Sequence, residues 1–242
     1  MIDIHTHILP GLDDGARDME DSLSMAALAL KRGVHTLVAT SHANTGGFFK
    51  DYSIDEYLQR LETFRKALDE VKLPLRVFSG MEIYMTREVP RMIREGRLLS
   101  LNQTGYFLTE FSFGIEQEEM DEMLHDLMEL GVTPVIAHPE RYRCVQESES
   151  GIAKWKNRGC LLQVNRGSIF GRFGSGAKQC VDRLLDQHMV TCIASDAHKP
   201  YERTTYMADI KEYMEQEYSF EYSKKLLYDN PKRILEGEKV VQ

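Results

Sequence analysis

Length, composition and charge limit the classes to which this chain can belong. It has 242 residues, 42% of them hydrophobic, and a formal charge of −8 at pH 7. This is enough for one sizeable core, so we expect a single domain over residues 1–242. The negative charge argues against a surface that coats nucleic acid. No apolar stretch approaches the roughly 20 residues of a membrane span and no basic leader opens the chain, so we expect a cytoplasmic protein without membrane insertion.

Strand-like and helix-like segments alternate along the whole chain. Short β-rich apolar runs indicate strands, and longer stretches with apolar residues at helical spacing indicate helices. We expect strands at residues 1–5, 34–41, 75–83, 105–111, 132–138, 160–166 and 190–196, and helices at residues 19–33, 53–72, 86–96, 117–131, 150–158, 175–189 and beyond 201. Ser53 and Glu56 form a capping box for the second helix, and Gly33 and Gly131 are expected C-cap glycines. Such alternation predicts parallel strands with helices outside, as a barrel or as an open doubly wound sheet.

The first strand ends in a His-x-His pattern. Side chains at positions i and i+2 of a strand project from the same face, so His5 and His7 can reach one metal ion without bending the backbone. Ligand residue types also end the later strand-like segments: His42, Glu82, Glu110, His138, Asp196 and His198. A barrel gathers the carboxyl ends of all its strands at one mouth, whereas an open sheet uses only a few of them. The barrel is therefore favoured, with a metal site at these ends.

Other candidate residues are open to simpler interpretations. Asp14 is a candidate ligand on the turn before the first helix, although an Asx turn is an alternative role for either Asp13 or Asp14. The remaining histidines, His35, His125 and His188, lie within or beside expected helices and strands, so we expect ordinary surface or core residues there.

A cysteine mechanism has little support. Cys160 and Arg166 have the Cys-x5-Arg spacing of cysteine-dependent tyrosine phosphatases, but the residues between them form a strand and lack the glycines that curl backbone N–H groups around phosphate. We therefore expect Cys160 not to act as a nucleophile. The four cysteines also lack CxxC spacing, so reduced thiols are the simplest interpretation.

Several motifs together resemble one family of metallohydrolases. They are His5-Thr6-His7, the Leu-Pro-Gly-Leu-Asp-Asp-Gly turn at 9–15, Thr40-Ser41-His42, Gly80-Met81-Glu82, the His-Pro-Glu-Arg-Tyr string at 138–142 and Ser195-Asp196-Ala197-His198. In order and spacing the chain resembles the PHP (polymerase and histidinol phosphatase) metallohydrolases. More narrowly, it resembles the bacterial tyrosine-protein phosphatases that regulate capsule and exopolysaccharide synthesis. The double-Asp turn and the His-Pro-Glu-Arg-Tyr string are typical of that narrower group.

The resemblance implies a distorted (β/α)7 barrel of the PHP type that holds three divalent metal ions, most often manganese. The implied ligands are His5, His7, Glu82 and Asp196 for one ion, Glu82, Glu110 and His138 for a second, and Asp14, His42 and His198 for the third. Other PHP phosphatases often have histidine at the positions of Asp14 and Glu110. Because the set mixes carboxylates with imidazoles, iron, zinc and magnesium stay open as well.

The chemistry that follows is phosphate ester hydrolysis. Clustered cations lower the pKa of bound water to around 7, so we expect attack of metal-bound hydroxide on phosphorus with no covalent enzyme intermediate. Arg141 and Arg203 follow ligand-bearing strand ends and can bind phosphate oxygens as bidentate donors, with Arg166 as a weaker candidate. The loop with Phe48 and Phe49 either forms an aromatic wall for a substrate ring or anchors itself to the core.

By resemblance, the substrate is the phosphotyrosine tail of a bacterial tyrosine kinase. A phenolate leaves more easily than an alkoxide, so phosphotyrosine needs less help from a general acid than phosphoserine does. Alternatives are a histidinol phosphatase, another small phosphomonoesterase, a PHP-type nuclease, or a metal-binding regulatory module without activity.

Overall fold

All strands of this computed structural model run parallel to their neighbours. The structure describes residues 1–49 and 51–240. Its strands are β1 (Ile2–Thr6), β2 (Thr36–Ala39), β3 (His42–Ala43), β4 (Arg76–Ser79), β5 (Glu82–Tyr84), β6 (Tyr106–Glu110), β7 (Thr133–Ala137), β8 (Leu161–Asn165) and β9 (Cys192–Ala194). One sheet has the order β1-β2-β4 and the other the order β3-β5-β6-β7-β8-β9. The parallel α/β class expected from the sequence is confirmed.

The second and third of the expected strands are each divided in two. The chain leaves β2, which pairs with β1 and β4, and then enters β3, which pairs with β5 in the other sheet. Gly80 lies at the corresponding break between β4 and β5. A Cβ there would lie 2.7 Å from Val38 Cγ1 and 2.9 Å from Leu101 Cδ2, so the close packing at this break requires glycine. Beyond the breaks, the register of β3 and β5 sets His42 opposite Glu82.

The carboxyl ends of the first and last strands also meet. The N–H of Asp196 donates to the carbonyl of His5 at 3.0 Å, and the N–H of His7 donates to the carbonyl of Ala197 at 2.8 Å. Thr6 and Ala197 form a parallel bridge. These bonds tie the end of β1, in one sheet, to the segment that follows β9, in the other.

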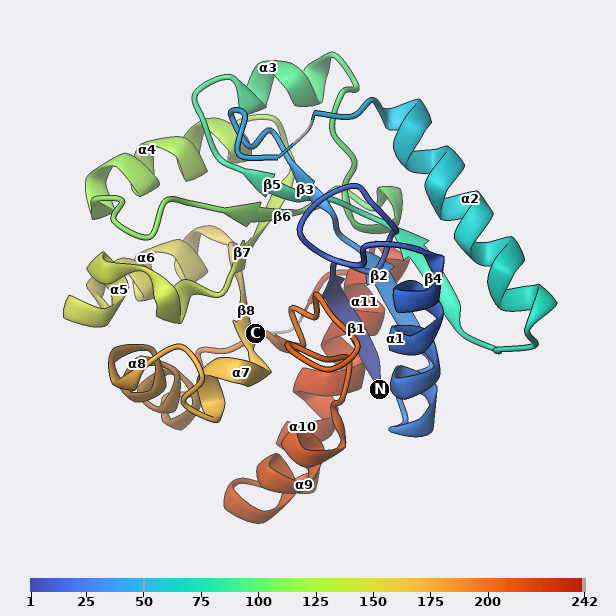
Figure 1. Ribbon diagram of the computed structural model, residues 1–242. Coiled ribbons are helices and arrows are strands. Elements are labelled where there is room, and N and C mark those ends of the chain that lie inside the picture. The colour runs from blue at the N-terminus through green and yellow to red at the C-terminus, as the bar shows by residue number, and fades with distance from the viewer. Residues whose placement is uncertain (50, 241–242) are drawn as a thin grey trace.

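Most helices lie outside the strands, whereas the last one, α11 (Asn230–Glu236), lies close behind β1 (Figure 1). The helices before it are α1 (Met19–Lys31), α2 (Ile54–Glu70), α3 (Val89–Arg94), α4 (Gln117–Met128), α5 (Arg143–Glu147), α6 (Ser150–Arg158), α7 (Arg166–Ile169), α8 (Ser175–Asp186), α9 (Ala208–Glu217) and α10 (Phe220–Lys224), with short helical turns η1 (Leu101–Gln103), η2 (Pro139–Arg141) and η3 (Lys225–Asp229). The side chain of Ser53 caps α2 by accepting from the N–H of Glu56, as expected. In the described part of the chain, no helix combines the length and apolarity needed to cross a membrane.

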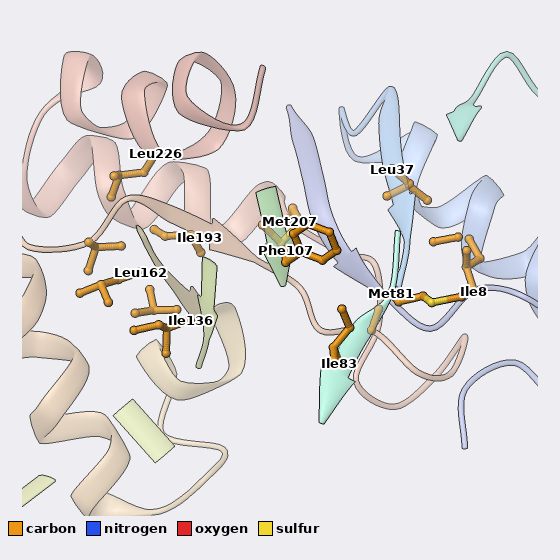
Figure 2. Packing of buried hydrophobic residues seen from close by; sticks show 14 of the residues in the cluster. Ile8, Leu37, Met81, Ile83, Phe107, Ile136, Leu162, Ile193, Met207 and Leu226 are labelled. Carbon is orange, nitrogen blue, oxygen red and sulfur yellow. The ribbon is translucent and has the colours of Figure 1, made fainter. Parts of the chain in front are cut away.

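The strands are buried on both faces. Ile136 and Leu162, neighbours in β7 and β8, lie together in the large cluster that packs against the outer helices (Figure 2). Side chains alternate along a strand, so the intervening residues face the other way. Those form a second cluster: Ile4, Val38, Leu108, Val135, Leu161 and Ala194 from the strands with Ile234 and Leu235 from α11. One inner face thus gathers side chains from both sheets.

Helix α11 and the residues after it lie at the amino ends of the strands. Asn230 donates from Nδ2 to the carbonyl of Thr191, just before β9, at 2.7 Å. The hydroxyl of Tyr106, the first residue of β6, donates to the carbonyl of Glu238 at 2.7 Å. The C-terminal helix therefore covers one end of the strands and leaves the carboxyl ends, which carry the candidate ligands, to the loops.

Candidate metal centre

The candidate ligands meet where the strands end. His5 and His7 come from the end of β1, His42 and Glu82 from the starts of β3 and β5, Glu110 from the end of β6, and the others from the loops after β1, β7 and β9. Each of the nine lies within 3.5 Å of a donor or acceptor atom of another: His5, His7, Asp14, His42, Glu82, Glu110, His138, Asp196 and His198. Residues spread over most of the chain thus form one cluster.

The most deeply buried group contains His5, His7, Glu82 and Asp196. The Nε2 atoms of His5 and His7 each lie 3.1 Å from Glu82 Oε2 and 3.5 Å from Asp196 Oδ1. The two nitrogens lie 3.3 Å from each other. These four residues are the set that the resemblance implies for one ion.

A second group forms at the more open side of the cluster. Asp14 Oδ1 lies 3.3 Å from His198 Nε2 and 3.7 Å from His42 Nε2, and its side chain is 45% exposed. His7 joins these three residues within the spacing that one ion can span. The implied set of Asp14, His42 and His198 is therefore together in space, with His7 as an additional neighbour.

A third group centres on the two glutamates. His42 Nδ1 lies 3.2 Å from Glu82 Oε2 and 3.6 Å from Glu110 Oε2. His138 Nε2 lies 3.0 Å from Glu82 Oε1 and 3.5 Å from Glu110 Oε1. Glu82 thus belongs to the first and third groups and also contacts His42, which is a member of the second. Both His42 and His138 approach Glu110, whereas the resemblance implies only His138 as its neighbour.

The donor atoms fit divalent metal ions better than they fit one another. Ligands about 2.1 Å from a shared ion lie roughly 3.0 to 3.4 Å apart, close to the spacings in the buried group. Among the described residues, His42 Nδ1, His198 Nε2 and Asp196 Oδ1 are buried and have no hydrogen-bond partner. Buried polar atoms normally have partners, so these lone pairs are best explained as ligand positions.

Two side chains that the sequence analysis missed orient the imidazoles. Gln163 Oε1 lies 2.7 Å from His5 Nδ1, and Asp13 Oδ2 lies 2.8 Å from His7 Nδ1. Acceptors at Nδ1 hold the proton there and turn the Nε2 lone pairs toward the cluster. A polar residue inside the apolar run of β8 was the available signal for Gln163.

The double-Asp turn divides its two acids between two roles. Asp13 forms the Asx turn, accepting from the N–H of Gly15 at 2.9 Å, and also accepts from the N–H of His42 at 2.9 Å. Asp14 points into the cluster. A Cβ on Gly15 would lie 2.1 Å from the carbonyl oxygen of His7, so this turn can close over the first strand only with glycine.

The outer oxygen of Asp196 is held by protein donors. Asn165 Nδ2 donates to Asp196 Oδ2 at 2.6 Å, and Arg203 forms an ion pair with the same oxygen, with a guanidinium nitrogen 2.6 Å away. Glu140, from the His-Pro-Glu-Arg-Tyr string, accepts from the N–H of Asn165 at 2.9 Å and from Ser168 Oγ at 2.5 Å. These contacts leave Oδ1 of Asp196 facing the imidazoles.

Three site residues adopt the left-handed conformation that side chains rarely occupy. The φ angles are 34° at His138, 51° at Asp196 and 47° at Arg203. Such a conformation costs of order 1 to 3 kcal/mol and persists where the surroundings impose it. The sharp turns after β7 and β9 direct these side chains back over the strand ends.

Electrostatics within the cluster are unfavourable for protein groups alone. Burial and the negative charge of Glu82 raise the pKa of Glu110 to about 9. Burial lowers the pKa of His138 to about 4, so its imidazole is neutral at pH 7. At pH 7 Glu110 is therefore protonated in the protein alone. A bound cation would favour its ionised carboxylate and would accept the lone pair of the neutral His138 imidazole.

The cluster opens into a cavity of about 270 Å³ with an aromatic and cationic wall. Phe48, Phe49, Phe113, Arg141 and Arg203 line it. The ring of Phe49 stacks on His42, 5.0 Å between centroids, whereas Phe48 is 81% exposed. The loop after β3 therefore borders the site with one anchored and one exposed ring.

The guanidinium group of Arg141 lies between two aromatic rings. Its Cζ atom is 4.3 Å from the ring centroid of Phe113 and 4.4 Å from that of Phe173. Arg203 lies 5.8 Å from the Phe173 centroid, so one ring touches both arginines. Cation–π contacts of this kind hold a guanidinium group in place without using its N–H donors.

Arg166 lies elsewhere. It forms an ion pair with Asp209, with Nε donating to Oδ1 at 2.8 Å, and does not line the cavity that Arg141 and Arg203 share. Within the described residues, His35, His125 and His188 belong to none of the ligand groups. Cys160 is buried just before β8, and burial raises the pKa of its thiol to about 12.

Comparison with known proteins gives the chain a family. The family described as capsular polysaccharide synthesis, CpsB/CapC, matches residues 1–236. The tyrosine-protein phosphatase YwqE of Bacillus subtilis (strain 168) is 35% identical over 99% of this chain and 93% of its own length. The tyrosine-protein phosphatase CpsB of Streptococcus pneumoniae is 31% identical over 97% of this chain and 98% of its own length.

A solved structure agrees with this relationship. It comes from a study of YwqE from Bacillus subtilis and CpsB from Streptococcus pneumoniae as unique metal-dependent tyrosine phosphatases. It matches with a TM-score of 0.92 at 34% identity and covers 100% of this chain and 96% of that chain. The chain therefore belongs to the CpsB/CapC family of capsular polysaccharide synthesis proteins.

Proposed function

We propose that this protein is a metal-dependent protein-tyrosine phosphatase, a phosphoric monoester hydrolase that acts in capsule or exopolysaccharide synthesis. The observation that carries the proposal is one pocket in which inward-facing imidazole and carboxylate atoms adjoin the guanidinium groups of Arg141 and Arg203. The naming of the YwqE and CpsB relatives as tyrosine-protein phosphatases supports it.

The architecture we propose is a distorted (β/α)7 barrel of the PHP type. Support comes from the bridge between Thr6 and Ala197, which joins the first and last strands, and from the inner apolar cluster that draws on both sheets. Counting β2 with β3 and β4 with β5 gives seven segments, as the sequence predicts. A barrel places all the ligand-bearing ends at one mouth.

The cofactors we propose are three divalent metal ions, with manganese favoured by the family resemblance and iron, zinc or magnesium also compatible with the donors. Eight residues from the three groups described above would hold them, with His138 added beside the two glutamates: His5, His7, Asp14, His42, Glu82, Glu110, Asp196 and His198. Such cations supply a nucleophile from water at neutral pH and neutralise phosphate charge.

The protein's own groups bind and orient the ester. Arg203 Nε is buried and has no hydrogen-bond partner among the described residues, so its N–H is free to donate to a phosphate oxygen. Arg141, fixed between two rings, is positioned for the same role. A Cys160 thiol with a pKa of about 12 stays protonated at neutral pH, so no cysteinyl phosphate forms.

The substrate we propose is the phosphotyrosine tail of a bacterial tyrosine kinase, and we propose that the protein acts on it in the cytoplasm.

The test is elemental analysis of the purified protein combined with hydrolysis of a phosphotyrosine peptide before and after chelation. We expect several equivalents of metal and loss of turnover in chelator that added manganese restores. Unchanged turnover in the stripped protein, or faster hydrolysis of histidinol phosphate or single-stranded DNA than of the peptide, would contradict the proposal.

A further inference from the structure

A second and larger cavity adjoins the candidate metal centre. It has a volume of about 730 Å³ and lies between the loop after β3, the start of α2 and the residues of and after α3. We call it the flank pocket. It shares His42 and Thr45 with the smaller cavity that contains the arginines. The two cavities therefore lie next to each other, and a polypeptide that leaves the smaller one can pass over the shared residues to reach the flank pocket.

The wall between the two cavities is fastened to the sheet. Asn44 Nδ2 donates to the carbonyl of Tyr84 at 2.8 Å and to Thr86 Oγ1 at 3.0 Å. On the other side of the loop, the Tyr52 hydroxyl donates to the carbonyl of Ser41 at 3.0 Å. The flank pocket is thus bounded by side chains with fixed partners.

The lining of the flank pocket combines an apolar floor with a charged rim. Met81, Met92 and Leu98 form the floor. Met81 and Leu98 are buried, whereas Met92 is half-buried and offers more of its side chain to a ligand. Methionine side chains adapt to apolar groups of different shape. The rim carries charges of both signs, namely Asp51, Asp55, Glu88, Arg91 and Arg97. Arg91 is already paired with Glu88 at 2.9 Å.

This lining suits polypeptide better than a second phosphate. A phosphate site needs unpaired donors, whereas the rim of the flank pocket mixes carboxylates with two arginines that already have carboxylate partners, Arg91 with Glu88 and Arg97 with Glu95. An extended peptide offers what the pocket can bind: an apolar side chain for the floor and polar backbone groups for the rim. Because the smaller cavity holds about 270 Å³, residues next to a bound phosphotyrosine must lie outside it.

We infer that the flank pocket binds the polypeptide on one side of the phosphotyrosine, with an apolar side chain of the substrate on the floor formed by Met81, Met92 and Leu98. The inference rests on the proposed phosphatase function and adds a substrate-selecting site to it. A small aryl phosphate occupies only the smaller cavity, which Arg141 and Arg203 line and which we call the arginine cavity. A substrate peptide also contacts the flank pocket, so it gains binding free energy there that an aryl phosphate lacks.

The test compares two substrates on matched variants. Met92→Trp fills the floor, and Met123→Trp on α4, a half-buried methionine outside both cavities, is its control. We expect Met92→Trp to lower kcat/KM for a phosphotyrosine peptide about tenfold, mainly through KM, because burial of one large apolar side chain changes a binding constant by that order. Turnover of p-nitrophenyl phosphate should stay near the wild-type rate. Equal losses on both substrates, or no loss on the peptide, would overturn the inference.

A second measurement needs no variant and is safe from folding effects. Wild-type enzyme is given phosphotyrosine peptides with leucine, glycine or glutamate placed in turn at each flanking position. We expect leucine to be preferred at one position on one side only, through a lower KM. Equal KM values across the series would refute the flank pocket while leaving the phosphatase proposal intact. A protein inactive on every phosphotyrosine substrate and on p-nitrophenyl phosphate would instead refute the phosphatase proposal.

Discussion

Asp13 offers the sharpest test of how the candidate metal centre is built. Its side chain is fully buried, and one oxygen accepts from both His7 Nδ1 at 2.8 Å and the N–H of His42 at 2.9 Å. The other oxygen accepts from the N–H of Gly15 at 2.9 Å. All three partners are donors, which a carboxylate satisfies completely. Asp13→Asn keeps the shape and replaces one acceptor by a donor.

Either orientation of the new amide is unfavourable. If the NH2 group faces His7, two donors meet, and the imidazole can recover only by moving its proton to Nε2, the atom that faces Glu82 and Asp196 at 3.1 and 3.5 Å. If it faces Gly15, the turn loses its bond and the imidazole loses its charged partner. Hydrogen bonds to charged groups contribute about 1.5 to 3 kcal/mol. Since about 1.4 kcal/mol is a factor of ten, metal affinity should fall roughly ten- to hundredfold, as is usual when a partner of a ligating histidine is removed.

Metal affinity is measured directly by titrating the stripped protein with manganese or zinc against a competing chelator. Asp69→Asn, at the far end of α2, is the control for loss of one carboxylate. We expect the weakest-binding equivalent to be lost first in Asp13→Asn. Without metal this variant should still unfold cooperatively, at a temperature a few degrees below that of Asp69→Asn because its buried hydrogen bonds are lost. If Asp13→Asn binds as tightly as wild type, Asp13 does not set the orientation of His7, and the account of the imidazoles is wrong.

Three further predictions concern the arginine cavity and the excluded cysteine. Arg141→Ala should lower the phosphatase rate at least about a hundredfold without unfolding, because it removes a positioned donor to the phosphate; a near-normal rate would exclude Arg141 from the reaction. Phe173→Leu should lower kcat/KM for an aryl phosphate about fivefold, because its ring contacts Arg141 and one cation–π contact contributes about 1 kcal/mol. Phe170→Leu is the control, because the ring of Phe170 contacts Arg166 instead, and it should leave kcat/KM unchanged. Equal effects of the two changes would refute the role of Phe173 in positioning Arg141. Cys160→Ser should keep most of the activity, and loss of turnover in the folded variant would revive a thiol mechanism.

The elements that the sequence predicts well are those with long or regular patterns. Each expected strand is present, and α2 begins after Ser53, whose side chain caps it by accepting from the N–H of Glu56. The division of two strands was not predicted. At the break between β4 and β5 it accompanies the packing of Gly80 against Val38 and Leu101, which are distant in sequence. The short helices α5 and α7 were missed because five or four residues are too few to show a helical period.

The candidate ligands were predictable because ligand residue types stand out at the ends of apolar runs. Their supporting residues do not. Gln163 contacts a histidine 158 positions away, so only the fold shows what it is for. For Asp13 the sequence predicts only a turn-forming role; the structure shows the turn and, with the same side chain, the contacts to His7 and His42. Arg166 directly follows a strand and Arg141 follows one closely, so the sequence does not distinguish them. The structure does, because Arg141 lines the cavity whereas Arg166 pairs with Asp209 outside it.

The amino ends of the strands carry apolar packing that stabilises the fold, and the carboxyl ends carry the candidate ligands. At the amino ends, Ile234 and Leu235 of α11 complete the inner apolar cluster, and their burial stabilises the fold without touching the ligands. At the carboxyl ends, buried carboxylates, imidazoles in close contact and left-handed backbone at His138 and Asp196 all cost free energy in the protein alone. Such a cluster can persist only because the rest of the structure supplies the stability, and bound cations would offset the repulsion between its carboxylates. The features that weaken the isolated chain are therefore those that fit it for binding metal and phosphate.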